Sequence, residues 1–130
     1  MFTGTPLPPL PACLEDAPMS SGLLYSCEQR ALAFGANRRT PVARRPVADL
    51  RREGGRVVVL PCTTRARDND ARFFELPLEQ VMWLGPQPAD QRNSVFERYE
   101  VVPAAALHGK IGIMAQPLRI ELMQWLHSRY

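Results

Sequence analysis

The chain has 130 residues, with 45% hydrophobic and 22% charged side chains, values typical of a soluble globular domain rather than a disordered or membrane-spanning chain. At this length folding buries roughly two thirds of the surface of the unfolded chain, so we expect a single hydrophobic core. The formal net charge is +3, and the 13 prolines favour short strands and loops over long helices.

The basic side chains and the cysteines indicate which partners, cofactors and compartment to expect. Lys110 is the only lysine, so arginine supplies nearly all the positive charge; arginine suits planar contacts with phosphates and bases, but a GC-rich genome has the same bias. Cys13, Cys27 and Cys62 are odd in number and lack CxxC spacing, so we expect no disulfide framework, metal site or other cofactor. Reduced thiols are typical of a cytoplasmic protein, so we expect that location. No apolar run is as long as the ~20 residues that a membrane span needs, so we expect no membrane contact.

The N-terminal segment differs in composition from the rest of the chain. Residues 1–18 are rich in proline and show no strand or helix period, which predicts an extended or poorly ordered arm. Met19 follows at once and is a second candidate for the natural start. We therefore expect a single folded domain over residues 19–130.

The first part of the domain reads as strands around a basic loop. The pieces "GLLYSC" (22–27) and "ALAFG" (31–35) predict a first strand and the start of a second. The segment "GANRRTPVARRP" (35–46) concentrates four arginines, which we expect to stay outside the core.

The run "RVVVLPCT" (56–63) is the strongest strand signal in the chain. It is β-branched and does not alternate, which predicts a central strand covered on both faces. Because Pro61 cannot donate to a strand ladder, the strand is expected to bend just before Thr63.

The remaining elements follow in order. They are a strand in "ARFFELP" (71–77), a variable loop (78–93), two strand pieces in "SVFERYEVV" (94–102), a helical turn in "PAAAL" (103–107), a short strand in "GKIGIM" (109–114) and an amphipathic terminal helix over 117–128. The predicted fold class is mainly β with a C-terminal helix.

In this order, the pieces "GLLYSC", "RRTPV", "VVVLPCT" and "NSVFERYEVVPAAALHGKIG" with the closing helix resemble the MazF/PemK family of toxin endoribonucleases. The likeness spans roughly residues 20–127. No piece is specific alone, and their order carries the resemblance. It implies a small SH3-like barrel, similar to that of CcdB-type gyrase-poisoning toxins, with a C-terminal helix.

The resemblance also implies metal-independent cleavage of single-stranded RNA, by attack of a 2′-hydroxyl on the adjacent phosphate to leave a cyclic phosphate. In the family, an arginine before a Pro-Val pair and a hydroxyl at the end of the long strand flank the RNA backbone. The hydroxyl corresponds to Thr63. The arginine corresponds to Arg39, beside Thr40-Pro41-Val42, or to Arg45, directly before Pro46-Val47, and both stay open.

Neighbouring residues would then contact the substrate. The predicted RNA-binding residues are Arg38, Thr64, Arg65 and Arg67, with Arg72 on the same edge. Tyr25, Phe34 and Trp83 are candidates to stack unpaired bases, although each also suits a hydrophobic core. His108 and His127 lie late in the chain, and we expect no two-histidine mechanism.

One segment departs from the family pattern. In "PVARRPVADLRREGG" (41–55), charges and Pro46 interrupt the expected second strand, which puts the active geometry in question. Three functions therefore stay open: a homodimeric toxin neutralised by a small antitoxin with an acidic tail, a non-catalytic SH3-like module that binds protein or nucleic acid, and a small subunit of a larger complex docked through the arm.

Overall fold

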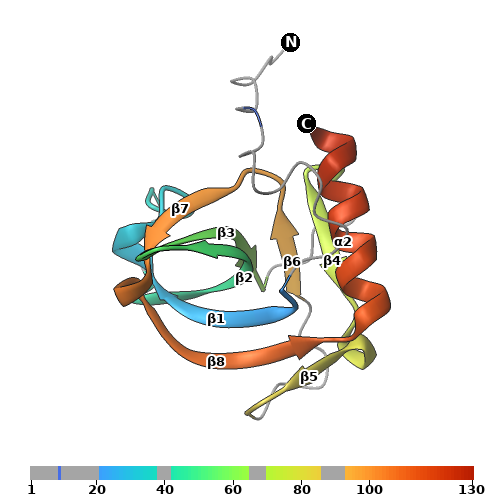
Figure 1. The fold of residues 1–130 in the computed structure, drawn as a ribbon, viewed down its shortest axis with the longest axis horizontal. Coiled ribbons are helices and arrows are strands. Elements are labelled where there is room, and N and C mark those ends of the chain that lie inside the picture. The colour runs from blue at the N-terminus through green and yellow to red at the C-terminus, as the bar shows by residue number, and fades with distance from the viewer. Residues whose placement is uncertain (1–8, 10–20, 38–41, 65–69, 86–92) are drawn as a thin grey trace.

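The computed structural model describes residues 9, 21–37, 42–64, 70–85 and 93–130. Within these ranges the chain forms a curved sheet with an α-helix beside one end (Figure 1). The elements are β1 (Leu23–Glu28), η1 (Gln29–Ala31), β2 (Arg44–Glu53), β3 (Arg56–Thr63), β4 (Phe73–Leu76), η2 (Leu78–Gln80), β5 (Val81–Trp83), β6 (Asn93–Phe96), β7 (Glu100–Pro103), η3 (Ala104–Ala106), β8 (Leu107–Met114) and α2 (Gln116–Arg129), where η marks a 3₁₀ helix. The prediction of a mainly β fold with a C-terminal helix is confirmed.

The strands are antiparallel and follow the order β4-β6-β3-β2-β1-β8-β5, while β7 pairs with β3 outside this path. On one side, β3 pairs with β7 from Arg56 to Val59 and with β6 at Cys62 and Thr63. Pro61 falls between these two stretches, where a missing N–H is tolerated. At the place where a bend was expected, just before Thr63, β3 thus changes its neighbour from β7 to β6.

Two hydrophobic clusters lie on opposite faces of the central strands. From β3, Val58 and Leu60 enter a larger cluster together with α2, β4 and β6, whereas Val57 and Val59 enter a smaller one with β7 and η3. All four are buried, which confirms that β3 is covered on both faces. Burial of one such side chain stabilises the fold by about 1.5–3 kcal/mol, so β3 anchors both clusters.

The prediction that Pro46 and the charges of residues 41–55 interrupt the second strand is wrong. β2 runs without a break for ten residues between β1 and β3. Pro46 has Ser26 of β1 as its partner, while the pairing of β2 with β3 begins only at Val47. On the side of β2 that faces β3, Pro46 therefore lies before the first paired residue, where its missing N–H costs no hydrogen bond. Further along, a register shift between Asp49 and Arg51 absorbs one extra residue.

Two other expectations also fail. The segment 31–35 does not start a strand, because η1 and a turn closed by Ala36 N–H to Ala33 O (3.1 Å) occupy this part of the chain. Gly35, with φ +78°, gives that turn its left-handed residue. The loop expected over 78–93 contains η2 and β5, since Val81–Trp83 pairs with β8. Apolar runs this short have no readable period.

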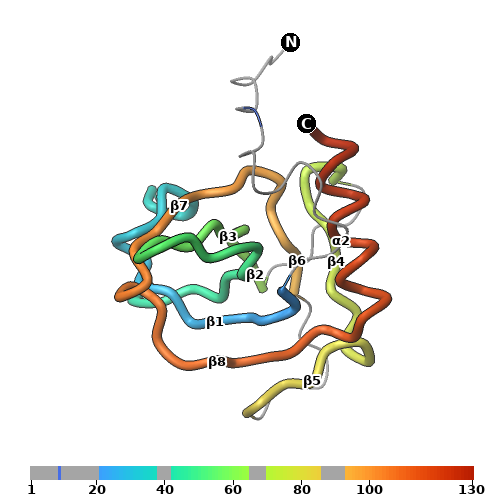
Figure 2. The backbone as a smooth tube through the Cα atoms, viewed as in Figure 1, coloured from blue at the N-terminus to red at the C-terminus, as the bar shows by residue number. Residues whose placement is uncertain are grey.

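The helix expected over 117–128 corresponds to α2. Its buried residues, Leu118, Leu122, Met123 and Leu126, belong to the larger cluster, and the helix lies alongside β4 (Figure 2). None of the helices in the described ranges is long and apolar enough to cross a membrane.

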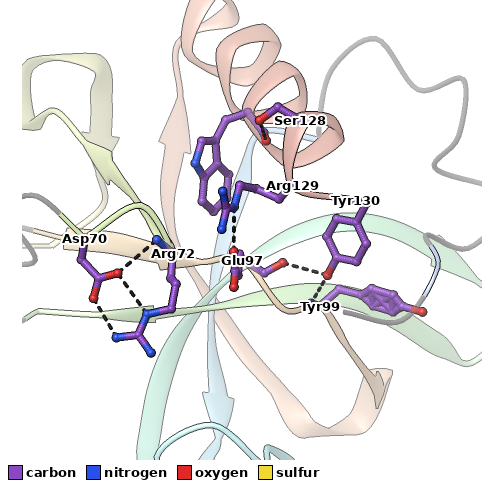
Figure 3. A network of polar contacts seen from close by, with 8 residues as sticks. Asp70, Arg72, Glu97, Tyr99, Ser128, Arg129 and Tyr130 are labelled. Atoms are coloured by element: carbon purple, nitrogen blue, oxygen red, sulfur yellow. Dashed lines mark hydrogen bonds and ion pairs between the residues drawn. The ribbon is translucent and has the colours of Figure 1, made fainter. Parts of the chain in front are cut away.

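The end of α2 is fastened to the bend between β6 and β7. The Tyr130 hydroxyl donates to the carbonyl oxygen of Glu97 at 2.8 Å and accepts from the Tyr99 N–H at 3.2 Å (Figure 3). Arg129 Nε lies 2.7 Å from Glu97 Oε1. These contacts hold the helix against the strands that lead into the site described next.

Candidate functional site

The first residues of β2 and the last residues of β3 lie side by side, because the two strands are antiparallel. The pairing of β2 with β3 ends at Val47 and Pro61, so Arg45 and Thr63 each lie two residues beyond the same pair. Arg45 Nη1 donates a hydrogen bond to the Cys62 carbonyl oxygen at 3.0 Å. Two of the three residues predicted to be catalytic, Arg45 and Thr63, therefore lie near the same end of the sheet.

The Arg45 guanidinium is enclosed, although the arginines of this segment were expected to stay outside the core. The residue is 5% exposed. Its Nε donates to Gln29 Oε1 at 2.8 Å, and its Cζ lies 4.9 Å from the centroid of the Phe34 ring. The expectation fails because η1 and the turn after it fold back over the start of β2. The polar and aromatic partners there offset the cost of burying a charge.

The turn that covers Arg45 is held by a carboxylate from β7. Glu100 Oε1 accepts a hydrogen bond from Ala33 N–H at 2.7 Å, and its Oε2 accepts one from Phe34 N–H at 3.0 Å. The Gln29 side chain adds a third link, since its Nε2 donates to the Phe34 carbonyl oxygen at 2.6 Å. Gln29 and Glu100 escaped the sequence prediction because isolated amides and carboxylates have no distinctive spacing.

Thr63 is also buried, although it is the last residue of β3. It is 6% exposed and stands opposite Ser94 of β6, whereas Thr64 is exposed. Asn93 and Ser94 are buried as well, so polar side chains gather where β3 meets β6. The only sequence signal for this group is the pair "NS" directly before the apolar "VF".

Three phenylalanines form a separate aromatic cluster beside Arg45. The ring centroids of Phe34 and Phe96 are 4.9 Å apart, those of Phe73 and Phe96 5.1 Å, and those of Phe34 and Phe73 6.3 Å. All three are half-buried, and none belongs to either hydrophobic cluster. An aromatic group next to a guanidinium can stack unpaired bases. Of the three, sequence reasoning named only Phe34.

The thiol beside Arg45 is unsuited to acid–base or nucleophilic chemistry at neutral pH. Burial raises the pKa of Cys62 to about 12, and the nearby Arg45 charge opposes this only in part. A thiol with so high a pKa is almost wholly protonated near pH 7.

Several predicted RNA contacts cannot be placed. Arg38, Arg39, Arg65 and Arg67 lie outside the described residues. Arg72 is exposed and forms a two-bond pair with Asp70, with Nε to Oδ1 at 3.0 Å and Nη2 to Oδ2 at 2.8 Å (Figure 3).

The other predicted residues lie elsewhere in the fold. The Tyr25 ring is half-buried, with the Arg52 Cζ 5.0 Å from its centroid, and Trp83 of β5 packs against the larger hydrophobic cluster. His108 Nε2 lies 3.6 Å from Glu28 Oε2, and His127 belongs to α2.

Comparison with solved structures shows which fold surrounds this site. The chain is similar to the Mycobacterium tuberculosis toxin MazF-mt6, with a TM-score of 0.58 over 82% of this chain and 94% of that chain. The chain has the fold of a MazF toxin. The two sequences are 18% identical. No protein-family model matches the sequence, and neither does any curated protein. The MazF fold is therefore established through the backbone, in agreement with the resemblance of the sequence pieces.

Proposed function

We propose that this protein is a toxin-like endoribonuclease that cleaves single-stranded RNA without a metal ion. The observation that supports the proposal is a MazF fold in which the Arg45 guanidinium hydrogen-bonds the carbonyl of Cys62, the residue directly before Thr63. We assign the arginine role to Arg45 because Pro46-Val47 follows it directly and because its guanidinium bonds the carbonyl of the residue before Thr63. Arg39 lies outside the described residues.

The reaction needs stabilisation of the charge that develops on the phosphoryl oxygens. The 2′-hydroxyl loses its proton as its oxygen attacks phosphorus, the bond from phosphorus to the 5′-oxygen breaks, and the 5′-oxygen takes up a proton. The products are a 2′,3′-cyclic phosphate and a 5′-hydroxyl. In this proposal the Arg45 guanidinium donates to the phosphoryl oxygens, and the Thr63 hydroxyl orients the phosphate. Both residues are more than 90% buried, so RNA can reach them only if this end of the sheet opens locally.

Flanking parts of the RNA would bind around this pair. Bases would stack on the cluster of Phe34, Phe73 and Phe96, and the phosphates would contact basic and hydroxyl side chains. Those side chains are Arg38, Arg39, Thr64, Arg65 and Arg67. A homodimer, and a small antitoxin whose acidic tail covers the basic segments, would complete the assembly.

A second function is favoured by one observation. The Arg45 guanidinium already hydrogen-bonds Gln29 and the Cys62 carbonyl, as expected of an arginine that stabilises a fold. In that case the protein is a non-catalytic SH3-like module that binds a protein or a nucleic acid.

Variants at the two strand ends separate these functions. Arg45→Ala is expected to lower kcat/KM for RNA cleavage by about 10²–10³-fold, as loss of a transition-state charge partner does. Thr63→Val, which keeps the shape of the side chain, is expected to lower it by about tenfold.

The matched control is Arg56→Ala, because Arg56 is an exposed arginine at the opposite end of β3. It should leave cleavage within about twofold of the wild-type value, while the melting temperature monitors folding in every variant. Tight RNA binding without cleavage by the wild-type protein would favour the binding module.

A further inference from the structure

The orientation of the Arg45 guanidinium depends on a side chain outside β2 and β3. An arginine side chain has four rotatable bonds, so a guanidinium directs its N–H groups reliably only when more than one of its edges is held. The Cys62 carbonyl holds Nη1 at 3.0 Å, and Gln29 Oε1 holds Nε at 2.8 Å. Gln29 is thus a side-chain anchor of this guanidinium.

Gln29 is itself fixed in place. It is 8% exposed and opens η1 directly after β1. Its backbone N–H donates to the Ala43 carbonyl at 3.0 Å, just before β2 begins, and its Nε2 donates to the Phe34 carbonyl at 2.6 Å. Both polar atoms of the amide therefore have partners on different segments.

This pair of contacts requires an amide. A glutamate at this position could accept from Arg45 but could not donate to the Phe34 carbonyl, and a leucine could do neither. The amide therefore links the direction of the Arg45 N–H groups to the turn that carries the Phe34 ring, which stacks on the same guanidinium.

We propose that Gln29 is a positioning residue: it holds Arg45 in the orientation that meets the scissile phosphate, and it couples that orientation to the Phe34 turn. The inference rests on the proposed ribonuclease function of Arg45. It assigns Gln29 no contact with RNA, so its effect should fall on kcat rather than on KM.

The kinetic test compares Gln29→Leu with Gln29→Glu. Gln29→Leu is expected to lower kcat by about 10- to 100-fold, the value of a hydrogen bond to a charged group, with KM within about threefold. Gln29→Glu keeps the acceptor for Arg45 Nε, so part of kcat should return. The matched control is Gln124→Leu, because Gln124 is exposed on α2 and should leave both constants unchanged.

A second readout does not depend on cleavage. In the wild-type protein the NMR signal of the Arg45 Nε–H, assigned by its loss in Arg45→Lys, should exchange slowly with water. In Gln29→Leu this exchange should be at least about tenfold faster, while in Gln29→Glu it should stay slow.

The two readouts distinguish failure of this inference from failure of the proposed function. Equal loss of kcat in the Leu and Glu variants, or an unchanged Nε–H exchange rate in Gln29→Leu, would overturn the positioning role. If the wild-type protein leaves RNA intact, the ribonuclease function fails, and the exchange rates alone decide whether Gln29 orients Arg45. If Gln29→Leu does not fold, the exchange rate of the Arg45 Nε–H is compared between Gln29→Glu and the wild-type protein. Fast exchange in Gln29→Glu would then contradict the positioning role of Gln29.

Discussion

At the scale of single residues, Gly35 leaves no room for a side chain beside Arg45. A Cβ atom built on Gly35 would lie 2.4 Å from Arg45 Nη2, and the residue has φ +78°. Gly54, in the turn between β2 and β3, shares the left-handed backbone at φ +60° but has nothing within 4 Å of such a Cβ. The two glycines therefore separate backbone strain from displacement of Arg45.

We predict that Gly35→Ala and Gly54→Ala each lower the free energy of unfolding by about 1 kcal/mol through strain, with a larger loss for Gly35→Ala. Only Gly35→Ala should also lower RNA cleavage, by about tenfold or more, because it moves the guanidinium. Thermal unfolding and single-turnover cleavage measure the two effects. Equal cleavage rates in the two variants would show that the contact between Gly35 and Arg45 does not affect cleavage.

Asp49 is a second residue whose environment makes a clear prediction. Its side chain is 2% exposed, and Oδ1 has no hydrogen-bond partner within the structure as described. Burial raises the pKa of this carboxyl above its usual 3.8, and the hydrogen bond from Arg52 opposes the shift. The folded state thus holds the Asp49 proton more tightly than the unfolded state does.

The contribution of Asp49 to stability is fully present below pH 3.8 and is lost as the pH rises through the higher pKa of the folded state. At pH 7, well above the usual pKa of the unfolded carboxyl, the raised pKa lowers the stability of the folded state. Asp49→Asn should therefore raise the free energy of unfolding at pH 7 by about 1 kcal/mol, since the ion pair with the half-exposed Arg52 contributes little. Glu121→Gln on the exposed face of α2 is the control. A less stable Asp49→Asn protein would mean that the Arg52 pair outweighs desolvation.

At the scale of elements, the sequence predicted β3 well because a dense β-branched run has few alternatives. It failed at β2, where Arg45 brings a charge into a buried strand. The partner of Arg45, Gln29, comes from η1 and becomes its neighbour only after folding. Asp49, by contrast, is paired within β2 itself, with Arg52 three residues later.

The end of α2 offers a test of how the helix is fixed. Tyr130→Phe removes the hydroxyl that bonds Glu97 and Tyr99, so it should lower the free energy of unfolding by about 1–2 kcal/mol while the stacking on Tyr99 remains. Tyr99→Phe is the matched control, because its hydroxyl bonds the Pro9 carbonyl at an exposed position. That change should stay within about 0.5 kcal/mol. Equal losses in chemical unfolding would assign the stability to the rings instead.

At the scale of the whole molecule, the MazF fold gives Arg45 and Thr63 a common location but does not by itself give them an activity. The same curved sheet can serve as a binding surface, and the enclosure of Arg45 by Gln29, Phe34 and Gly35 suits either role. Function depends on whether RNA reaches this end of the sheet and reacts there.

The most direct measurement is therefore incubation of the purified protein, in EDTA, with a single-stranded RNA and with the same RNA carrying 2′-deoxyriboses. We expect cleavage of the unmodified RNA only, with 2′,3′-cyclic phosphate ends, and loss of that cleavage in Arg45→Ala. Intact RNA at a protein concentration that saturates binding would contradict it, and would leave the protein as a binding module with a MazF fold.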